Sequence, residues 1–147
     1  MKISVVDDNI IVFLNKYISN IDYNDSKELE KFIKKIIDKL DNYGVIKKGY
    51  YDTHIYVDND YGIIIELSKD SLDYMDLDDV IDMKITISKV KLLYKINDIY
   101  DGKIYLYKNS LYLDPINIDI NLYEHSEIIY KNVDEIRKFG RILKSML

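Results

Sequence analysis

Side chains with carboxylate oxygens gather in one short stretch of this 147-residue chain. Residues 70–83 read DSLDYMDLDDVIDM and contain six aspartates in fourteen positions. Carboxylates at this density can bind a hard cation, exchange protons in a catalytic site, or attract a basic partner. The spacing and the neighbouring residues decide which of these three chemistries is favoured.

Metal binding is disfavoured by the spacing. A calcium-binding loop needs acids at its first, third and fifth positions, glycine at the sixth and glutamate at the twelfth. Residues 70–83 contain no glycine, and the other acidic stretch, 58–67, has Gly62 at its fifth position and Glu66 at its ninth. The chain also has no cysteine that could supply a thiolate ligand. The sequence therefore predicts no bound metal and no other cofactor.

Catalysis is the second alternative. Asp79 and Asp82 lie nearest to the apolar residues of the run, so a cleft there would separate the pKa values of these two carboxylates. The chain has two histidines, His54 and His125, but no G-x-S-x-G elbow for a serine nucleophile and no phosphate-binding glycine loop. The sequence favours a non-enzymatic protein. The enzymatic alternative is a small-molecule enzyme that uses Asp79, Asp82 or His54.

The charge is distributed unevenly along the chain, whose net charge is −5. Residues 49–82 hold ten acids and one base, for −9, whereas residues 1–48 sum to +1 and residues 83–147 to +3. Such an acidic block can promote solubility and keep a sheet edge from pairing with other chains. Alternatively, it can attract a basic partner to this part of the surface. Direct nucleic-acid binding is disfavoured, since it needs clustered cations.

The hypothesis that follows is a small, acidic interaction module that contacts a macromolecular partner through residues 70–82. The partner is expected to be another protein with a basic surface. Aromatic and methionine side chains are favoured at interface cores, and the acidic run contains both. The expected contact residues are Asp73, Tyr74, Met75, Asp76, Asp78 and Asp79. A further alternative is an inhibitor that mimics the charge of nucleic acid.

Length and composition favour a single α+β domain over residues 1–147, with a possible subdivision near 68–80. The chain is 48% hydrophobic and 32% charged, which is typical of a packed domain. The absence of cysteine suits the cytoplasm, and the apolar runs, such as 10–14, are too short to span a membrane. We expect a cytoplasmic protein without a membrane segment. Ile, Lys, Asn and Tyr, whose codons are AT-rich, are abundant, and Ala, whose codons are GC-rich, is absent. This composition predicts an AT-rich genome.

The clearest single element is a helix over 26–42. Asp25 and Glu28 form a capping pair in front of it. Apolar residues then recur every three or four positions, which predicts one buried stripe. Gly44 is a suitable terminator.

A second helix is predicted over 133–146. Asn132 and Glu135 form a similar capping pair at its start. Gly140 lies in its middle and is unfavourable there unless a neighbour packs close. The expected inward stripe consists of Val133, Ile136, Phe139, Leu143 and Met146.

Alternation of apolar and polar residues predicts strands over most of the rest. The expected hairpins join 2–6 to 9–14, 51–57 to 62–67, and 103–108 to 111–113. The run Ile63-Ile64-Ile65 lacks alternation, so we expect its strand to be buried on both faces. Pro115 should end the last hairpin.

Three further segments complete the predicted sheet. Residues 83–87 and 91–96 are expected to be neighbouring strands. Residues 116–131 are ambiguous: Ile116, Ile118 and Ile120 alternate with polar residues, which favours strand, and 127–130 is a further candidate strand. Helices and strands do not alternate along the chain. This order predicts an α+β fold with mostly antiparallel sheets and the two helices packed on one side.

Two segments resemble a known family. The sequences KIYLYKNSLYL (103–113) and NVDEIRKFGRIL (132–143) resemble the C-terminal domain of MecA-type adaptors, which deliver substrates to Clp-type unfoldases. The resemblance covers about forty residues, and the long acidic linker of that family is missing. It implies a small acidic α+β adaptor and assigns no role to any single residue.

Overall fold

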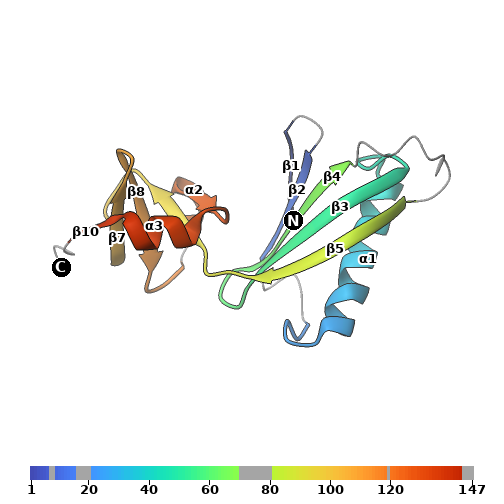
Figure 1. Cartoon of the computed structure of the whole chain (residues 1–147), viewed down its shortest axis with the longest axis horizontal. Helices are drawn as coiled ribbons and strands as arrows, with labels where there is room; N and C mark the ends of the chain where they lie inside the picture. The colour runs from blue at the N-terminus through green and yellow to red at the C-terminus, as the bar shows by residue number, and fades with distance from the viewer. Residues whose placement is uncertain (7–8, 16–20, 70–80, 119, 144–147) are drawn as a thin grey trace. The chain divides into compact units, whose positions relative to one another are not determined.

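The computed structural model describes residues 1–6, 9–15, 21–69, 81–118 and 120–143 (Figure 1). The chain forms two compact units, Met1–Lys89 and Val90–Leu147. Both units are mixed α and β, and together their described strands form two mostly antiparallel sheets. The subdivision predicted near 68–80 falls largely outside the described residues.

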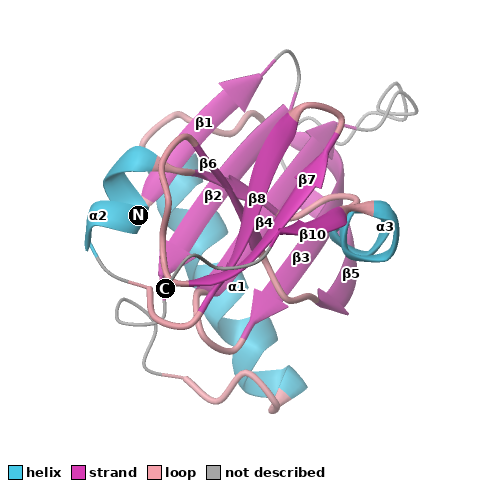
Figure 2. Ribbon diagram, turned by 90° about the vertical axis from the view of Figure 1, so that its left-hand side faces the viewer, coloured by secondary structure: helices cyan, strands magenta, loops and turns pink. Residues whose placement is uncertain are grey.

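The first unit is a five-stranded sheet with one long helix along one face (Figures 1 and 2). Its strands are β1 (Lys2–Val6), β2 (Asn9–Asn15), β3 (Gly49–Asp58), β4 (Gly62–Lys69) and β5 (Ile81–Lys89). Their order in the sheet is β1-β2-β4-β3-β5. The two predicted hairpins are confirmed as β1–β2 and β3–β4, whereas β5 pairs with β3 in parallel.

Helix α1 (Ser26–Asn42) has the predicted bounds. The carboxylate of Asp25 accepts hydrogen bonds from the backbone N–H groups of Lys27 at 3.1 Å and Glu28 at 3.3 Å. Gly44 follows the last turn with φ +73°, the left-handed conformation that ends many helices. Local signals at both ends therefore position α1.

One cluster of apolar side chains joins α1 to the sheet. The buried stripe of α1 faces alternate residues of the strands, as the helical and strand periods require. Strand β4 is buried on both faces, as predicted, since Ile63, Ile64 and Ile65 are each at most 1% exposed. The cluster contains Ile10, Val12, Leu14, Leu29, Ile33, Ile36, Ile37, Leu40, Ile46, Tyr51, Ile55, Val57, Ile63, Ile65 and Leu67.

The second unit is an antiparallel sheet with the order β10-β7-β8-β6-β9. Its strands are β6 (Leu93–Ile96), β7 (Gly102–Tyr107), β8 (Ser110–Pro115), β9 (Glu127–Ile129) and β10 (Arg141–Leu143). Lys108 and Asn109 join β7 to β8 with φ values of 46° and 63°, as a two-residue hairpin turn requires. The predicted hairpin and its end at Pro115 are confirmed.

The second sheet is covered on both faces, each by a short helix. Leu122 of α2 (Ile120–His125) packs in one cluster, and Ile136 of α3 (Val133–Phe139) packs in another. Neighbouring residues of β7, Ile104 and Tyr105, belong to these two different clusters. Because successive strand residues point to opposite faces, the two helices lie on opposite sides of this sheet.

The strand predicted across 116–131 is wrong over residues 120–125, which form α2. The alternating isoleucines do not form a buried face, because Ile116 and Ile120 are each 73% exposed. In this isoleucine-rich chain, isoleucine and polar residues can alternate even where the isoleucine side chains are exposed to solvent. The expected strand near 127–130 is present as β9.

The second predicted helix begins at Val133 but ends at Phe139, which is 66% exposed and not part of an inward stripe. Gly140 has extended backbone, and β10 then pairs with β7. A Cβ at Gly140 would overlap the backbone carbonyl oxygen of Ile136 and approach the Cβ of Tyr105 to 3.1 Å. The close neighbours that justify this glycine are therefore the Ile136 carbonyl and the Tyr105 side chain. Met146 lies outside the described residues.

Two local expectations are also corrected. Asn132 has left-handed backbone and makes no side-chain capping bond, so the predicted cap of the second helix is wrong. Strand β6 pairs with β8 and β9, and not with β5. The predicted pairing of 83–87 with 91–96 fails because the boundary between the two units falls at Lys89.

Candidate functional site

The predicted contact residues lie outside the described part of the chain. Asp73, Tyr74, Met75, Asp76, Asp78 and Asp79 all fall within 70–80. Of the six aspartates in the acidic run, the structure describes Asp82, the second residue of β5. The site that can be built from described residues therefore begins where the acidic run enters the sheet.

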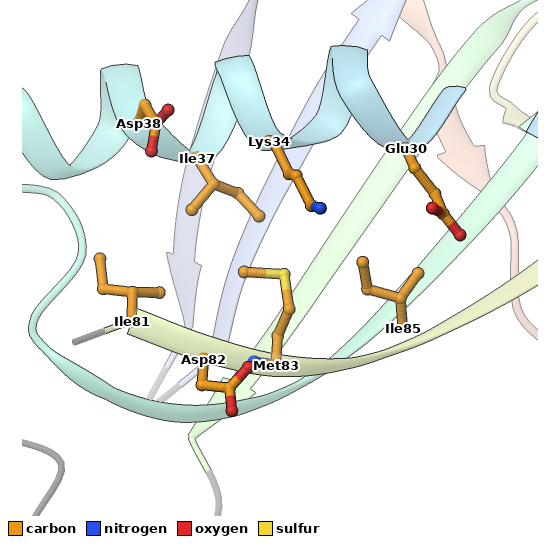
Figure 3. A pocket seen from close by; sticks show the side chains of 8 residues that line it. All are labelled: Glu30, Lys34, Ile37, Asp38, Ile81, Asp82, Met83 and Ile85. Carbon is orange, nitrogen blue, oxygen red and sulfur yellow. Dashed lines mark hydrogen bonds between the residues drawn. The ribbon is translucent and has the colours of Figure 1, made fainter. Parts of the chain in front are cut away.

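A groove of about 480 Å³ lies between α1 and β5 (Figure 3). Ile81, Met83 and Ile85 point from β5 towards the helix, and Ile37 and Lys34 point back from α1. The remaining lining residues are Glu30, Asp38 and Asp82. The groove thus has an apolar floor and a charged rim.

The sequence patterns of the two elements explain this lining. Glu30, Lys34 and Ile37 are spaced by four and three residues, so they lie on one flank of α1 beside its buried stripe. The strand period sends Met83 and its alternate neighbours to the side of the sheet that α1 covers. Ile37 is only 4% exposed, whereas Met83 is half-buried. The strand side of the groove therefore keeps apolar surface in contact with solvent.

Strand β5 is the last strand of its sheet and pairs with β3 along one side. Its nine residues make it the longest described edge, compared with five in β1 and three each in β9 and β10. An edge strand offers main-chain donors and acceptors to another chain. In β5, the N–H of Met83 donates to the carboxylate of Asp82 at 2.8 Å, so one donor is held by a side chain of its own strand.

The opposite face of this sheet carries a polar depression around His54. The Nε2 atom of His54 lies 2.8 Å from the Oγ of Ser88, and the imidazole stacks on Tyr56 with ring centroids 4.1 Å apart. The depression has a volume of about 350 Å³. Its lining residues are Asp52, Thr53, His54, Glu66, Ser68, Lys84 and Thr86.

The structure does not gather the residues of the enzymatic alternative into one pocket. Asp82 lines the groove, His54 lines the depression, and these two cavities share no lining residue. Asp79 is outside the described residues, and His125 ends α2 in the second unit, where it is exposed. Ser88 belongs to strand β5, and a strand does not present a serine as a nucleophile elbow does.

Two other kinds of site can be checked across the described ranges. Their His, Asp and Glu side chains form no group of three or more that could hold a metal ion. Among the helices of these same ranges, none is long and apolar enough to cross a membrane.

Comparison with known proteins returns no match: no family model fits the chain, and neither a curated protein nor a solved structure is similar to it. The resemblance of 103–113 and 132–143 to MecA-type adaptors stays a sequence-based expectation. Among the described residues, the groove and the strand edge beside it are the features that indicate a binding function.

Proposed function

We propose that this chain is a non-enzymatic interaction module that binds an extended segment of another polypeptide chain along β5. One observation carries the proposal: the long edge strand of the first sheet borders an apolar groove of about 480 Å³. Strand addition uses both features, because main-chain hydrogen bonds at the edge give affinity and pockets for alternate side chains give specificity.

The lining of the groove defines the chemistry of the bound segment. Apolar side chains at every second position would extend the row that Ile81, Met83 and Ile85 begin. The rim holds three carboxylates and one ammonium group, so its net charge is −3 + 1 = −2. Residues between the apolar ones would point away from α1, to the side of the sheet that Asp82 shares, so a basic residue opposite Asp82 is favoured. This agrees with the basic partner expected from the acidic run that precedes β5.

Selection of peptides on the full chain, followed by NMR, tests the proposal directly. From a random display library we expect peptides with alternating apolar residues and interspersed basic ones. In the ¹⁵N-labelled chain, these peptides should shift the amide resonances of β5 and of α1 around Lys34. Shifts confined to β3 and β4 around His54, with none at residues 81–85 or on α1, would instead support the enzymatic alternative and would contradict binding at β5.

We expect Met83→Lys to weaken binding of a selected peptide by roughly tenfold or more, because the substitution places an ammonium group on the apolar side of the groove. Thr86→Lys is the matched control. It adds the same charge to the same strand, at an exposed position that lines the opposite face. Isothermal titration calorimetry measures both affinities, and equal losses in the two variants would show that the groove is not the site.

The acidic run can be tested separately from the groove. We expect the combined change of Asp76, Asp78 and Asp79 to Asn to leave the melting temperature nearly unchanged and to slow association with a basic peptide, because long-range attraction acts mainly on the on-rate. Stopped-flow measurements at low and high salt should show a smaller salt dependence for the triple variant. An unchanged on-rate and salt dependence would remove the run from the binding surface.

A further inference from the structure

We infer that the segment bound along β5 is the β5 strand of a second copy of this chain, an inference that rests on the proposed function. The groove calls for alternating apolar side chains and for a cation facing Asp82. Strand β5 itself carries apolar side chains at every second position and Lys84 between two of them. It therefore has the composition that its own edge selects.

The charges of β5 fix one self-complementary register. When a strand pairs antiparallel with its own copy about a two-fold axis, the same contacts occur twice. An axis at Met83 places Ile81 opposite Ile85 of the second copy and Asp82 opposite Lys84 of the second copy. Opposed charges and opposed apolar side chains both stabilise a strand pair. Five consecutive positions of each copy, 81–85, are then matched without an unfavourable pair.

Other registers of the same strand are less favourable. An axis at Lys84 sets the two Lys84 ammonium groups opposite each other, which is destabilising. An axis at Ile85 sets Asp82 opposite Ser88 and leaves both kinds of charge without a counter-charge. Shifting the register by one residue opposes apolar to polar faces. The pairing centred on Met83 is the one that joins acid to base.

The side chains of β5 are oriented as this pairing requires. Asp82 and Lys84 are exposed and share the face away from α1, while Ile81, Met83 and Ile85 are half-buried on the groove side. The N–H of Met83, at the centre of the pairing, now donates to Asp82. On association, the second copy supplies a main-chain acceptor for this N–H, and the Asp82 carboxylate turns to the opposed ammonium group.

Sedimentation velocity on the full chain, from micromolar to millimolar concentration, tests the inference. We expect the wild type to show a concentration-dependent dimer. Asp82→Lys and Lys84→Asp should each raise the dissociation constant by roughly tenfold or more, because both opposed pairs become like charges. An equimolar mixture of the two variants should recover the dimer, since every opposed pair again contains one carboxylate and one ammonium group. Recovery in the mixture also shows that both variants are folded.

Three results would overturn the inference: a wild type that stays monomeric at millimolar concentration, a dimer that neither variant weakens, or two weakened variants whose mixture does not recover. Glu124→Lys, which changes an exposed carboxylate of the second unit by the same charge, must leave the dissociation constant unchanged. A monomeric wild type that still binds selected peptides at β5 refutes the second copy alone. A monomeric wild type that binds no selected peptide at β5 refutes the proposed function as well.

Discussion

Ile65→Ala is expected to lower the free energy of unfolding of the first unit by about 2–5 kcal/mol. Ile65 is 0% exposed in the central region of β4, between β2 and β3, and belongs to the cluster that joins the sheet to α1. Removing its side-chain carbons loses their transfer free energy and leaves a cavity that the surrounding strands fill only partly. Because domains are stable by about 5–15 kcal/mol, this one substitution removes a large share of the total.

The matched control is Ile3→Ala in β1, an edge strand of the same sheet. Ile3 is 37% exposed, so its truncation removes less buried surface and is expected to cost about 1 kcal/mol or less. Urea denaturation followed by circular dichroism measures both variants. Equal losses at the two positions would contradict the assignment of β4 to the centre of the core.

The elements that the sequence predicts correctly are those whose signals are local. Asp25 caps α1 through residues only two and three positions away, and Gly44 ends the same helix. The β7–β8 hairpin is likewise predicted, but its turn lies at Lys108 and Asn109, one residue before the expected 109–110. Such features need no knowledge of distant partners, so periodicity and turn chemistry are sufficient.

Non-local features could not be read in the same way. The parallel pairing of β5 with β3 joins Ile81 to Gly49, across the whole β3–β4 hairpin and the acidic run. Alternation in 83–87 shows that one face is buried, but it does not say which strand lies beside it. Since the groove is formed only once β5 lies next to α1, its lining could not be derived from the clustered negative charge of residues 70–82.

Gly140 shows how a local preference yields to packing. The apolar spacing continues beyond Phe139 and favours more helix, yet the chain becomes extended at Gly140 and pairs as β10 with β7. Tyr105 lies so close that a side chain there would be crowded. The pairing of Ile142 with Tyr105 adds a strand to the sheet, and tertiary contacts of this kind override weak helix propensity.

The second large effect is expected for Gly102→Ala, at the start of β7, which should destabilise the second unit by at least about 2–3 kcal/mol. Gly102 has φ +143°, which residues with a side chain rarely adopt. A Cβ there would also overlap the backbone carbonyl oxygen of Asp114 and approach the Cδ1 of Leu113 to 3.0 Å. Relieving either problem disturbs the pairing of Gly102 with Pro115 that begins the β7–β8 ladder.

Gly44→Ala separates the effect of backbone conformation from that of steric overlap. Gly44 also has positive φ, at +73°, but a Cβ there meets nothing within 4 Å. This control should cost only the backbone strain of a left-handed alanine, about 1–2 kcal/mol. Thermal denaturation of both variants, with amide hydrogen exchange in β7 and β8, measures the difference. If Gly102→Ala were no more destabilising than Gly44→Ala, the close approach of β8 to Gly102 would not contribute to the stability of the second sheet.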